Sequence, residues 1–228
     1  DACTFEAIQI ETAAATLPAN GDYHGVWVFA EQWDGKLKGV SYELLAKGRE
    51  LANNLQTELC AVAFGHGIDA ASLAAYGAEK VYLIDSPDFV RNPEDIFTRL
   101  LIDLIRQDKP EVVLAGATAL GRSFIPRVAA VLGTGLTADC TGLEIDTKSR
   151  LLVQTRPTFG GNIMATIICE TGRPQMATVR PRTFKAAVPD VKKSGQIINV
   201  DFKKEQVTSK TKLLNLIEDV TQTVKLEE

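Results

Sequence analysis

Residues 112–146 place the strongest constraint on the fold of this 228-residue chain. Residues 112–115 are apolar and predict a buried strand, residues 116–118 are small and predict a tight turn, and residues 120–132 have helical spacing. A strand, a tight turn and a helix in this order leave the N–H groups of the helix N-terminus free to bind an anion or a nucleotide.

Two polar residues mark the start of this helix. Thr118 is a suitable N-cap, because its hydroxyl can accept a hydrogen bond from an N–H group of the first turn. Arg122 stands in the first turn, where a cation opposes the helix dipole unless something negative lies nearby. Arg122 is therefore a candidate contact to a phosphate, to a carboxylate or to a partner protein. A solvated surface arginine is the alternative.

The first half of the chain alternates apolar runs with amphipathic segments. The expected strands are residues 26–30, 59–64 and 80–84. The expected helices are residues 40–55, 68–76 and 95–107. This pattern is typical of a parallel sheet covered on both faces. It predicts an α/β, Rossmann-like domain of the adenine-nucleotide α-hydrolase-like kind, whose ligands bind beyond the carboxyl ends of the strands.

The pattern changes after Gly135. Strand-like runs with turns between them, and with no helical segment, cover residues 138–146, 151–155, 163–169 and 176–180. They predict an antiparallel β extension of the sheet. The chain is polar from Pro181 on, except for apolar patches at 197–202 and 213–217. These patches are expected to be strands or arms that wrap another subunit or the rest of the chain.

Charge and composition exclude several classes of function. The net charge of −4 argues against nucleic-acid binding, which usually shows as a basic surplus. No apolar run is long enough to span a bilayer and no secretory leader opens the chain, so no membrane association is expected. Cys60 and Cys169 lie in apolar, strand-like runs, where reduced buried thiols are the expected state. The expected location is therefore the cytoplasm.

The opening residues DACTFEAI resemble the end of a ferredoxin-like cluster motif, in which a final ligand cysteine precedes a Pro-x-x-Ala-Ile segment. Cys3, Phe5, Ala7 and Ile8 match this motif, whereas Thr4 replaces the usual proline. A 4Fe-4S cluster needs four thiolates, and the three upstream cysteines are absent from this sequence. Cys3 is a candidate ligand only together with a preceding domain. An incidental cysteine in a frayed terminus is the alternative.

Five segments resemble the α subunit of electron-transfer flavoproteins by their order and spacing. They are VWVFAEQWDGKLKGVSYELLAKGRELA, GATALGRSFIPRVAA, LTADCTGLE, RPTFGGNIMATI and PQMATVRP. The resemblance extends from about Val26 to Glu228. It implies a base domain at 21–190 that packs on a β subunit, and an arm at 191–228 that leads to a flavin domain outside this sequence. Residues 1–20 are then a remnant or linker from a ferredoxin-like N-terminal domain.

The resemblance also implies a function. The family's α subunit passes electrons between NADH, FAD, ferredoxin and an acyl-CoA dehydrogenase-like or lactate dehydrogenase-like partner, and the bifurcating branch splits electron pairs. FAD is expected mainly in the β subunit and in the flavin domain, because the glycine-rich flavin segment is absent here. The chain is then an electron-transfer subunit of an oxidoreductase complex, in which the redox chemistry belongs to the cofactor.

The segment RPTFGGN, residues 156–162, carries the resemblance to the bifurcating branch. Gly160 and Gly161 allow close backbone approach to a flat ring or a pyrophosphate, since neither has a Cβ. Arg156 supplies a fixed charge that could steady a reduced, anionic flavin, and Asn162 could hydrogen-bond a ring edge or a ribose. The alternative is a bulge between two strands, with Arg156 in a surface ion pair.

Other candidates lie elsewhere in the chain. His66 lies between glycines at an expected strand end, where ligands bind in such folds, although a solvated loop histidine is the alternative. Arg127 and Arg180 are expected to be structural or interfacial. An adenine-nucleotide-binding stress or ATPase-like domain is the alternative function, but the turns after Ala30 and Phe64 supply no convincing phosphate loop. A structural assembly domain that binds no cofactor is a third reading.

Overall fold

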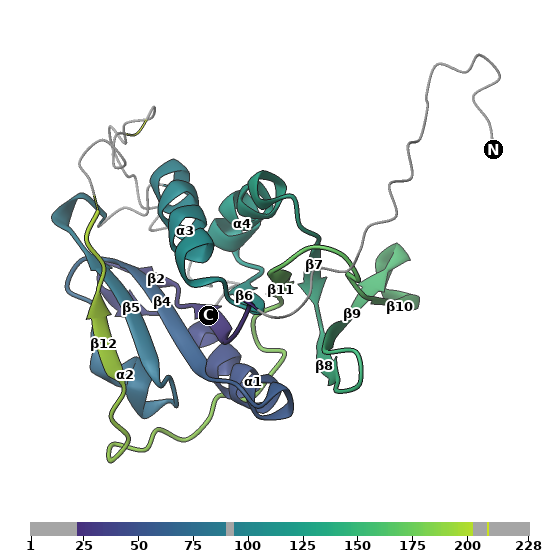
Figure 1. Ribbon diagram of the computed structural model, residues 1–228, viewed down its shortest axis with the longest axis horizontal. Coiled ribbons are helices and arrows are strands. Elements are labelled where there is room, and N and C mark those ends of the chain that lie inside the picture. Colours follow the sequence, from purple (N-terminus) through teal and green to yellow (C-terminus); the bar gives the residue numbers. More distant parts are fainter. Residues whose placement is uncertain (1–21, 90–93, 203–208, 210–228) are drawn as a thin grey trace, which may run out of the picture.

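The computed structural model describes residues 22–89, 94–202 and 209 of the chain. Its largest element is a parallel sheet, whose inner strands are the near-continuous apolar runs of the sequence. The strands are β1 (Val26–Phe29), β4 (Leu59–Gly65), β5 (Lys80–Asp85), β6 (Val112–Gly116), β7 (Leu136–Cys140), β11 (Gln175–Val179) and β12 (Gln196–Asn199). Their order is β12-β5-β4-β1-β6-β11-β7, and every neighbouring pair is parallel (Figure 1).

Helices cover both faces of this sheet. They are α1 (Gly39–Leu55), α2 (Ala70–Ala75), α3 (Glu94–Asp108) and α4 (Ala119–Leu132). Side chains alternate along β1, so that Val26 and Val28 pack in the core that includes α1 and α2, whereas Trp27 and Phe29 pack with α3 and α4. Figure 1 shows the two helix layers on opposite sides of the sheet. Because the strands are parallel, their carboxyl ends share one edge of the sheet, and this edge lies between the two helix layers.

A second, antiparallel sheet lies beyond β7. It consists of β8 (Gly142–Asp146), β9 (Leu151–Thr158) and β10 (Ile163–Ile167), in the order β10-β9-β8. The 3-10 turn η3 (Phe159–Gly161) joins β9 to β10, and this hairpin projects away from the central sheet in Figure 1. A small hairpin of β2 (Gln32–Trp33) and β3 (Lys36–Leu37) follows β1, and a 3-10 turn η2 (Pro87–Phe89) follows β5.

The predicted fold class is confirmed, because a parallel α/β sheet carries an antiparallel β extension. The expectation that residues 138–146 and 176–180 are antiparallel was wrong in part. β7 follows helix α4, and a strand–helix–strand crossover returns the chain in the parallel direction. β11 then inserts between β6 and β7, where it is buried along its whole length.

Two further expectations concern the chain after β11 and the cysteines. The apolar patch at 197–202 contacts the rest of the chain, since β12 pairs with β5, whereas residues 213–217 lie outside the described residues. Cys60 is buried in β4 as expected, but Cys169 lies beyond the end of β10 and is half-buried. Among the described residues Cys60, Cys140 and Cys169 are free thiols. Burial raises the pKa of the Cys140 thiol to about 12.

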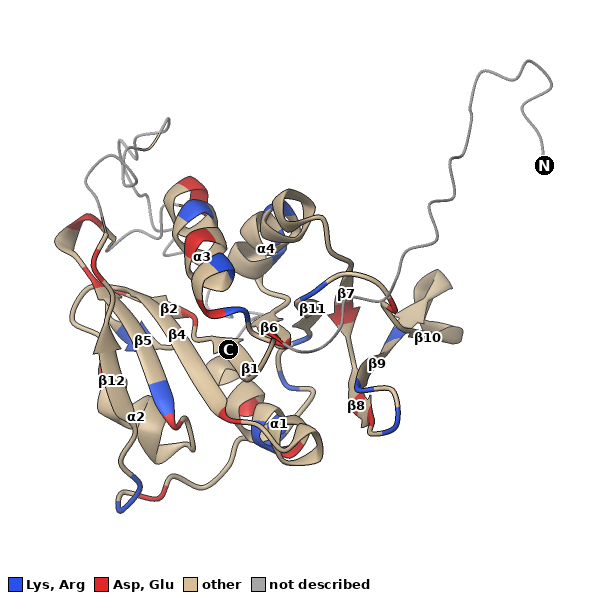
Figure 2. Ribbon diagram, viewed as in Figure 1, with Lys and Arg blue, Asp and Glu red and all other residues tan. Residues whose placement is uncertain are grey.

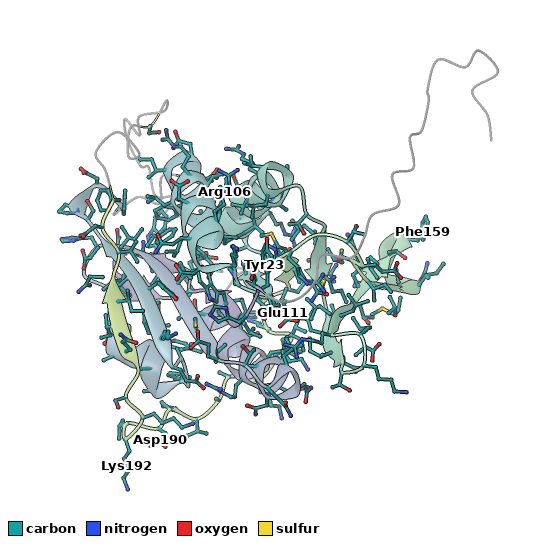
Figure 3. All side chains as sticks on the ribbon, viewed as in Figure 1. Tyr23, Arg106, Glu111, Phe159, Asp190 and Lys192 are labelled. Atoms are coloured by element: carbon teal, nitrogen blue, oxygen red, sulfur yellow. The ribbon has the colours of Figure 1, made fainter. Side chains whose placement is uncertain are left out.

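An ion pair between the half-buried Arg150 and the buried Glu111 joins the antiparallel sheet to the central sheet. Glu111, just before β6, is fully buried, and its two carboxylate oxygens accept hydrogen bonds from Nε and Nη2 of Arg150 at 3.0 and 2.7 Å. Arg150 also donates from Nη1 to the carbonyl of Leu55 at 3.1 Å. Its own carbonyl accepts from Gln175, whose Oε1 accepts from the N–H of Leu152. These bonds fix the start of β9, and Figure 3 labels Glu111.

A half-buried carboxylate, Asp108 at the end of α3, lies near Lys80 and Tyr82 of β5. Burial raises the pKa of this carboxyl group above its ordinary value, in opposition to the lowering effects of His24, Lys80 and a hydrogen bond with Tyr82. Its Oδ2 has no hydrogen-bond partner among the described residues. Because the native pKa is raised, the folded state gains stability relative to the unfolded state as the pH falls through it.

Asp108→Asn is therefore expected to raise the free energy of unfolding at pH 7 by up to about 1 kcal/mol, a modest value because the side chain is partly exposed. The gain should disappear below the unfolded-state pKa of about 3.9, where Asp108 is neutral in both states. Urea unfolding at neutral and acidic pH measures both effects. Asp88→Asn, at an exposed position, is the control. An equal gain at both pH values would contradict the titration argument.

Candidate functional site

The first candidate position is the N-terminus of α4, where the strand order reverses between β1 and β6. Ligands of doubly wound sheets bind at such a point. Here the buried carboxylate of Glu31 accepts a hydrogen bond from Thr118 Oγ1 at 2.5 Å and lies 3.5 Å from Lys38 Nζ. Thr118 Oγ1 in turn accepts from the N–H of Gly121 at 3.1 Å, so Thr118 is confirmed as the N-cap. The chain itself supplies the negative charge that a helix N-terminus favours.

Arg122 turns away from this carboxylate and toward β7. Its Nε donates to the carbonyl of Ala117 at 2.8 Å, and its Nη2 donates to Asp139 Oδ1 at 3.0 Å. Of the three partners considered from sequence, Arg122 thus contacts a carboxylate, and that carboxylate belongs to the chain. This ion pair also resolves the unfavourable placement of a cation in the first turn of α4.

The RPTFGGN segment forms the end of β9 and the turn η3. Gly160 and Gly161 have φ values of 70° and 93°, which glycine adopts without strain, and ideal Cβ atoms there would meet no atom within 4 Å. Phe159, with φ of 47°, is 82% exposed, and Figure 3 shows it at the outer end of the hairpin. Asn162 follows as the C-cap of the turn. The backbone at this turn is therefore open to a neighbouring group.

A pocket of about 420 Å³ lies against this turn. Arg156, the turn residues 157–161 and Arg180 line it. Arg156 belongs to β9, and Arg180 directly follows β11. The structure therefore places Arg156, Gly160 and Gly161 on the wall of one pocket, whereas Asn162 does not line it. The two arginines come from different sheets, and their meeting depends on how the antiparallel sheet is anchored.

Positive charge dominates the surroundings of the pocket. Asp139 accepts from Arg180 at 2.6 Å and from Arg122 at 3.0 Å, while the side chain of Arg156 has no ion-pair or hydrogen-bond partner among the described residues. The hydrogen bond from Arg180, and then the charges of Arg180, Arg122 and Arg156, hold the pKa of Asp139 below its usual value. One carboxylate thus faces three guanidinium groups. Figure 2 shows basic and acidic residues on β7, β9 and the chain after β11.

These residues fit a flat group that takes up negative charge, such as a flavin ring. The Nε atom of Arg156 is buried without a hydrogen-bond partner, so an anionic oxygen placed beside it would satisfy a donor that the chain leaves unpaired. The two glycines offer peptide planes without a Cβ in front of them. The arrangement can therefore hold a planar group and stabilise negative charge on it.

His66 is not part of this pocket. It follows β4, and its Nδ1 lies 2.8 Å from Asp85 Oδ1, while the N–H of Gly67 donates to Asp85 Oδ2 at 3.1 Å. β4 and β11 are three strand positions apart, which separates their ends by about 14 Å at the usual strand spacing. His66 therefore shares the carboxyl edge of the sheet with the pocket but belongs to another part of it.

The remaining expectations concern metal sites and membrane association. Cys3 lies outside the described residues. Within residues 22–89, 94–202 and 209, no group of three or more His, Cys, Asp or Glu side chains is arranged to hold a metal ion. In the same part of the chain, no helix combines the length and the apolar character needed to cross a bilayer.

Two functional candidates were missed by sequence reasoning. The sequence predicts a structural or interfacial role for Arg180 and gives no prediction for Asp139. The nearest signal is the sequence TVRP, in which an arginine directly follows a strand at the edge where ligands bind. Nothing in the local pattern around Asp139 separates it from an ordinary strand residue.

Comparison with known proteins identifies a family. Residues 26–205 match the family model described as "Electron transfer flavoprotein domain". The "Electron transfer flavoprotein subunit alpha" of Thermoanaerobacterium thermosaccharolyticum is 44% identical over 209 residues, which cover 91% of this chain and 63% of that protein.

Two further relatives have more specific names. The "Acryloyl-CoA reductase electron transfer subunit beta" of Anaerotignum propionicum is 38% identical over 90% of this chain and 63% of that protein. The "Lactate dehydrogenase (NAD(+),ferredoxin) subunit LctC" of Acetobacterium woodii is 39% identical over 86% of this chain and 47% of that protein. The chain thus spans about three fifths of the length of the first relatives, and less of the last.

Proposed function

The chain belongs to the electron transfer flavoprotein family, and from this membership we propose that it is an α subunit that passes electrons between flavins together with a partner subunit. The observation that carries the proposal to this chain's own residues is the pocket at the β9–β10 turn, in which Arg156 and Arg180 face a glycine pair. A flavin held mainly by the partner would lie against this turn.

The chain's residues bind and orient, whereas the flavin supplies the one- and two-electron chemistry when it is bound. Arg156 presents a guanidinium with an unpaired Nε, which stabilises negative charge on the ring. Gly160 and Gly161 allow the backbone to approach the ring closely. Asn162, at the end of the same turn, is available to hydrogen-bond a ring edge or a ribose from outside the pocket.

The surface of the hairpin supports a protein partner. Phe159, Ile163 and Met164 are 82%, 55% and 54% exposed, and all three belong to the turn or to β10. Large apolar side chains that gather on a projecting hairpin mark a surface that another protein covers. An electron-transfer flavoprotein β subunit that carries FAD would bury these side chains and bring its flavin to the pocket.

The names of two relatives support a finer proposal. They mention acryloyl-CoA reductase, lactate dehydrogenase, NAD(+) and ferredoxin. We infer for this chain a flavin-based bifurcating complex in which NADH delivers electrons, ferredoxin takes one, and an acyl-CoA dehydrogenase-like or lactate dehydrogenase-like partner takes the other. We also propose a cytoplasmic location. Cys3 would be one ligand of a 4Fe-4S cluster whose other ligands come from a preceding domain.

The alternative, an adenine-nucleotide-binding ATPase-like domain, has less support. Its phosphates would bind at the switch point beside the N-terminus of α4. The buried carboxylate of Glu31 already occupies this position through its bond with Thr118. A phosphate there would meet like charge in a region shielded from water, which is unfavourable.

Co-purification tests the proposed function. The chain, co-produced with an electron-transfer flavoprotein β subunit, should form a stable yellow complex with the absorbance of bound FAD. Phe159→Ser is expected to weaken this complex about tenfold or more, because it removes an apolar anchor from the hairpin. Val188→Ser, which changes an equally exposed valine outside the hairpin, is the matched control and should leave assembly unchanged. A colourless monomer that hydrolyses ATP would overturn the proposal.

A further inference from the structure

Asp139 occupies an irregular position in β7. Between the pairs Ala177↔Thr137 and Val179↔Cys140, β7 has one residue more than β11, which is the geometry of a β-bulge. Asp139 has φ of 67°, a left-handed conformation that aspartate tolerates better than most residues, and its N–H donates to Thr178 Oγ1 at 3.1 Å. A bulge re-aims a side chain, and here the carboxylate meets two arginines.

The carboxylate of Asp139 restrains Arg180. The bond from Arg180 Nη2 to Asp139 Oδ2 is 2.6 Å long, and the backbone N–H of Arg180 donates to the carbonyl of Cys140 at 3.1 Å. The Asp139 side chain is only 18% exposed, whereas that of Arg180 is 48% exposed. An arginine this exposed would otherwise sample many rotamers. Arg122 holds the other oxygen of the same carboxylate, so Asp139 is itself fixed from both sides.

We propose that Asp139 is a positioning residue, which holds the Arg180 guanidinium on the wall of the pocket so that Arg180 and Arg156 together stabilise negative charge on the flavin ring. This inference rests on the proposed function. Arg180 is then a second arginine that contacts the cofactor. The bulge in β7 then orients Asp139 toward Arg180.

Removing Asp139 changes the stability of an anion on the flavin ring, and the direction of this change distinguishes a positioning role from a direct effect of the Asp139 charge. Removing Asp139 removes a negative charge beside the pocket, so charge alone predicts that an anion on the ring becomes more stable. Positioning predicts the opposite, because Arg180 loses the partner that holds it in place. The same variant therefore gives opposite results under the two explanations.

Sulfite is a suitable probe of charge stabilisation in the assembled complex. Its lone pair forms a bond to N5 of an oxidised flavin, and the electron pair of the N5=C4a bond moves onto the ring, which then carries negative charge near N1 and the C2 oxygen. A cation fixed beside the ring stabilises this charge. The dissociation constant for sulfite, followed through the loss of visible flavin absorbance, therefore reports on the two arginines without any catalytic turnover.

The test uses variants of the full complex. Arg180→Ala should raise the sulfite dissociation constant about fivefold or more. Asp139→Gly, which removes the side chain without straining a positive φ, should raise it in the same direction. The double variant should be no worse than Arg180→Ala alone, because Asp139 acts through Arg180. Arg106→Ala, which removes an exposed arginine of α3 that does not line the pocket, should leave the constant unchanged.

The outcomes distinguish a failure of the inference from a failure of the proposed function. If Arg156→Ala weakens sulfite binding but Arg180→Ala does not, the inference is wrong and the proposed function stands. If Asp139→Gly strengthens sulfite binding while Arg180→Ala weakens it, Asp139 acts by charge alone and its positioning role is overturned. If neither Arg156→Ala nor Arg180→Ala changes the constant, no flavin lies at this pocket and the proposed function itself fails.

Discussion

Arg150→Ala is expected to lower the free energy of unfolding by about 3 kcal/mol, the largest stability effect anticipated for this chain. Arg150 donates two parallel hydrogen bonds to Glu111, which is fully buried, so its loss leaves a carboxylate without a counter-charge in the interior. Arg150 has φ of 57°, but alanine keeps a Cβ, so the substitution does not change the backbone strain. Urea unfolding of the wild type and the variant measures the difference.

Two further variants make this measurement specific. Lys148→Ala changes an exposed residue of the same turn and should stay within about 0.5 kcal/mol of the wild type. The double variant with methionine in place of both Arg150 and Glu111 should recover much of the loss, because no charge then remains buried. A full-size loss for Lys148→Ala, or none for Arg150→Ala, would show that the ion pair does not anchor the antiparallel sheet.

The sequence predicts the first half of this fold well because its signals are local. Helix α4 was expected at residues 120–132 and spans Ala119–Leu132, since an apolar repeat, the Thr118 cap and Gly133 at its end all act within the same stretch. The strands that precede it are runs of apolar residues bounded by turns, and they pair in parallel because helices separate them.

The second half shows where local signals fail. β7 and β11 pair with each other and not with the nearest strand in sequence, and a two-residue alternation carries no information on the direction of a partner. The separate antiparallel sheet is set by contacts such as that of Arg150 with Glu111, 39 residues away. No periodicity in either segment indicates that these two residues meet.

The candidate site likewise combines residues that the sequence indicates with residues that only the tertiary structure brings to it. Gly160 and Gly161 stand out in the sequence because a glycine pair has a local meaning, and Arg156 lies close to them in the chain. Arg180 and Asp139 join them only through the pairing of β11 with β7 and through a bulge. The positions of Arg122 at a helix start and of His66 at a strand end predict ligand contacts, yet Arg122 pairs with Asp139 and His66 pairs with Asp85.

Arg156→Ala is expected to slow the reduction of the complex's flavin by NADH about tenfold or more while leaving assembly intact. The guanidinium of Arg156 faces the pocket with Nε unpaired, and it is not engaged in an ion pair that supports the fold among the described residues. Negative charge that develops on the ring during reduction would lose a fixed donor, a loss that can cost a factor of about a hundred to a thousand in rate. Rapid-mixing measurements without oxygen, at saturating NADH, give this rate directly.

Two further variants, Arg156→Lys and Arg106→Ala, serve as controls for this measurement. Lysine keeps the charge but not the planar fork, so Arg156→Lys should recover only part of the rate. Arg106→Ala removes the same charge from an exposed position on α3, and the flavin of this variant should be reduced at the wild-type rate. The start of β9 is anchored by Arg150, and the Arg156 side chain forms no ion pair that supports the fold among the described residues. The free energy of unfolding of the Arg156 variants should therefore match that of the wild type within about 0.5 kcal/mol. Unchanged reduction kinetics in Arg156→Ala, with the flavin fully bound, would exclude Arg156 from the contact with the ring.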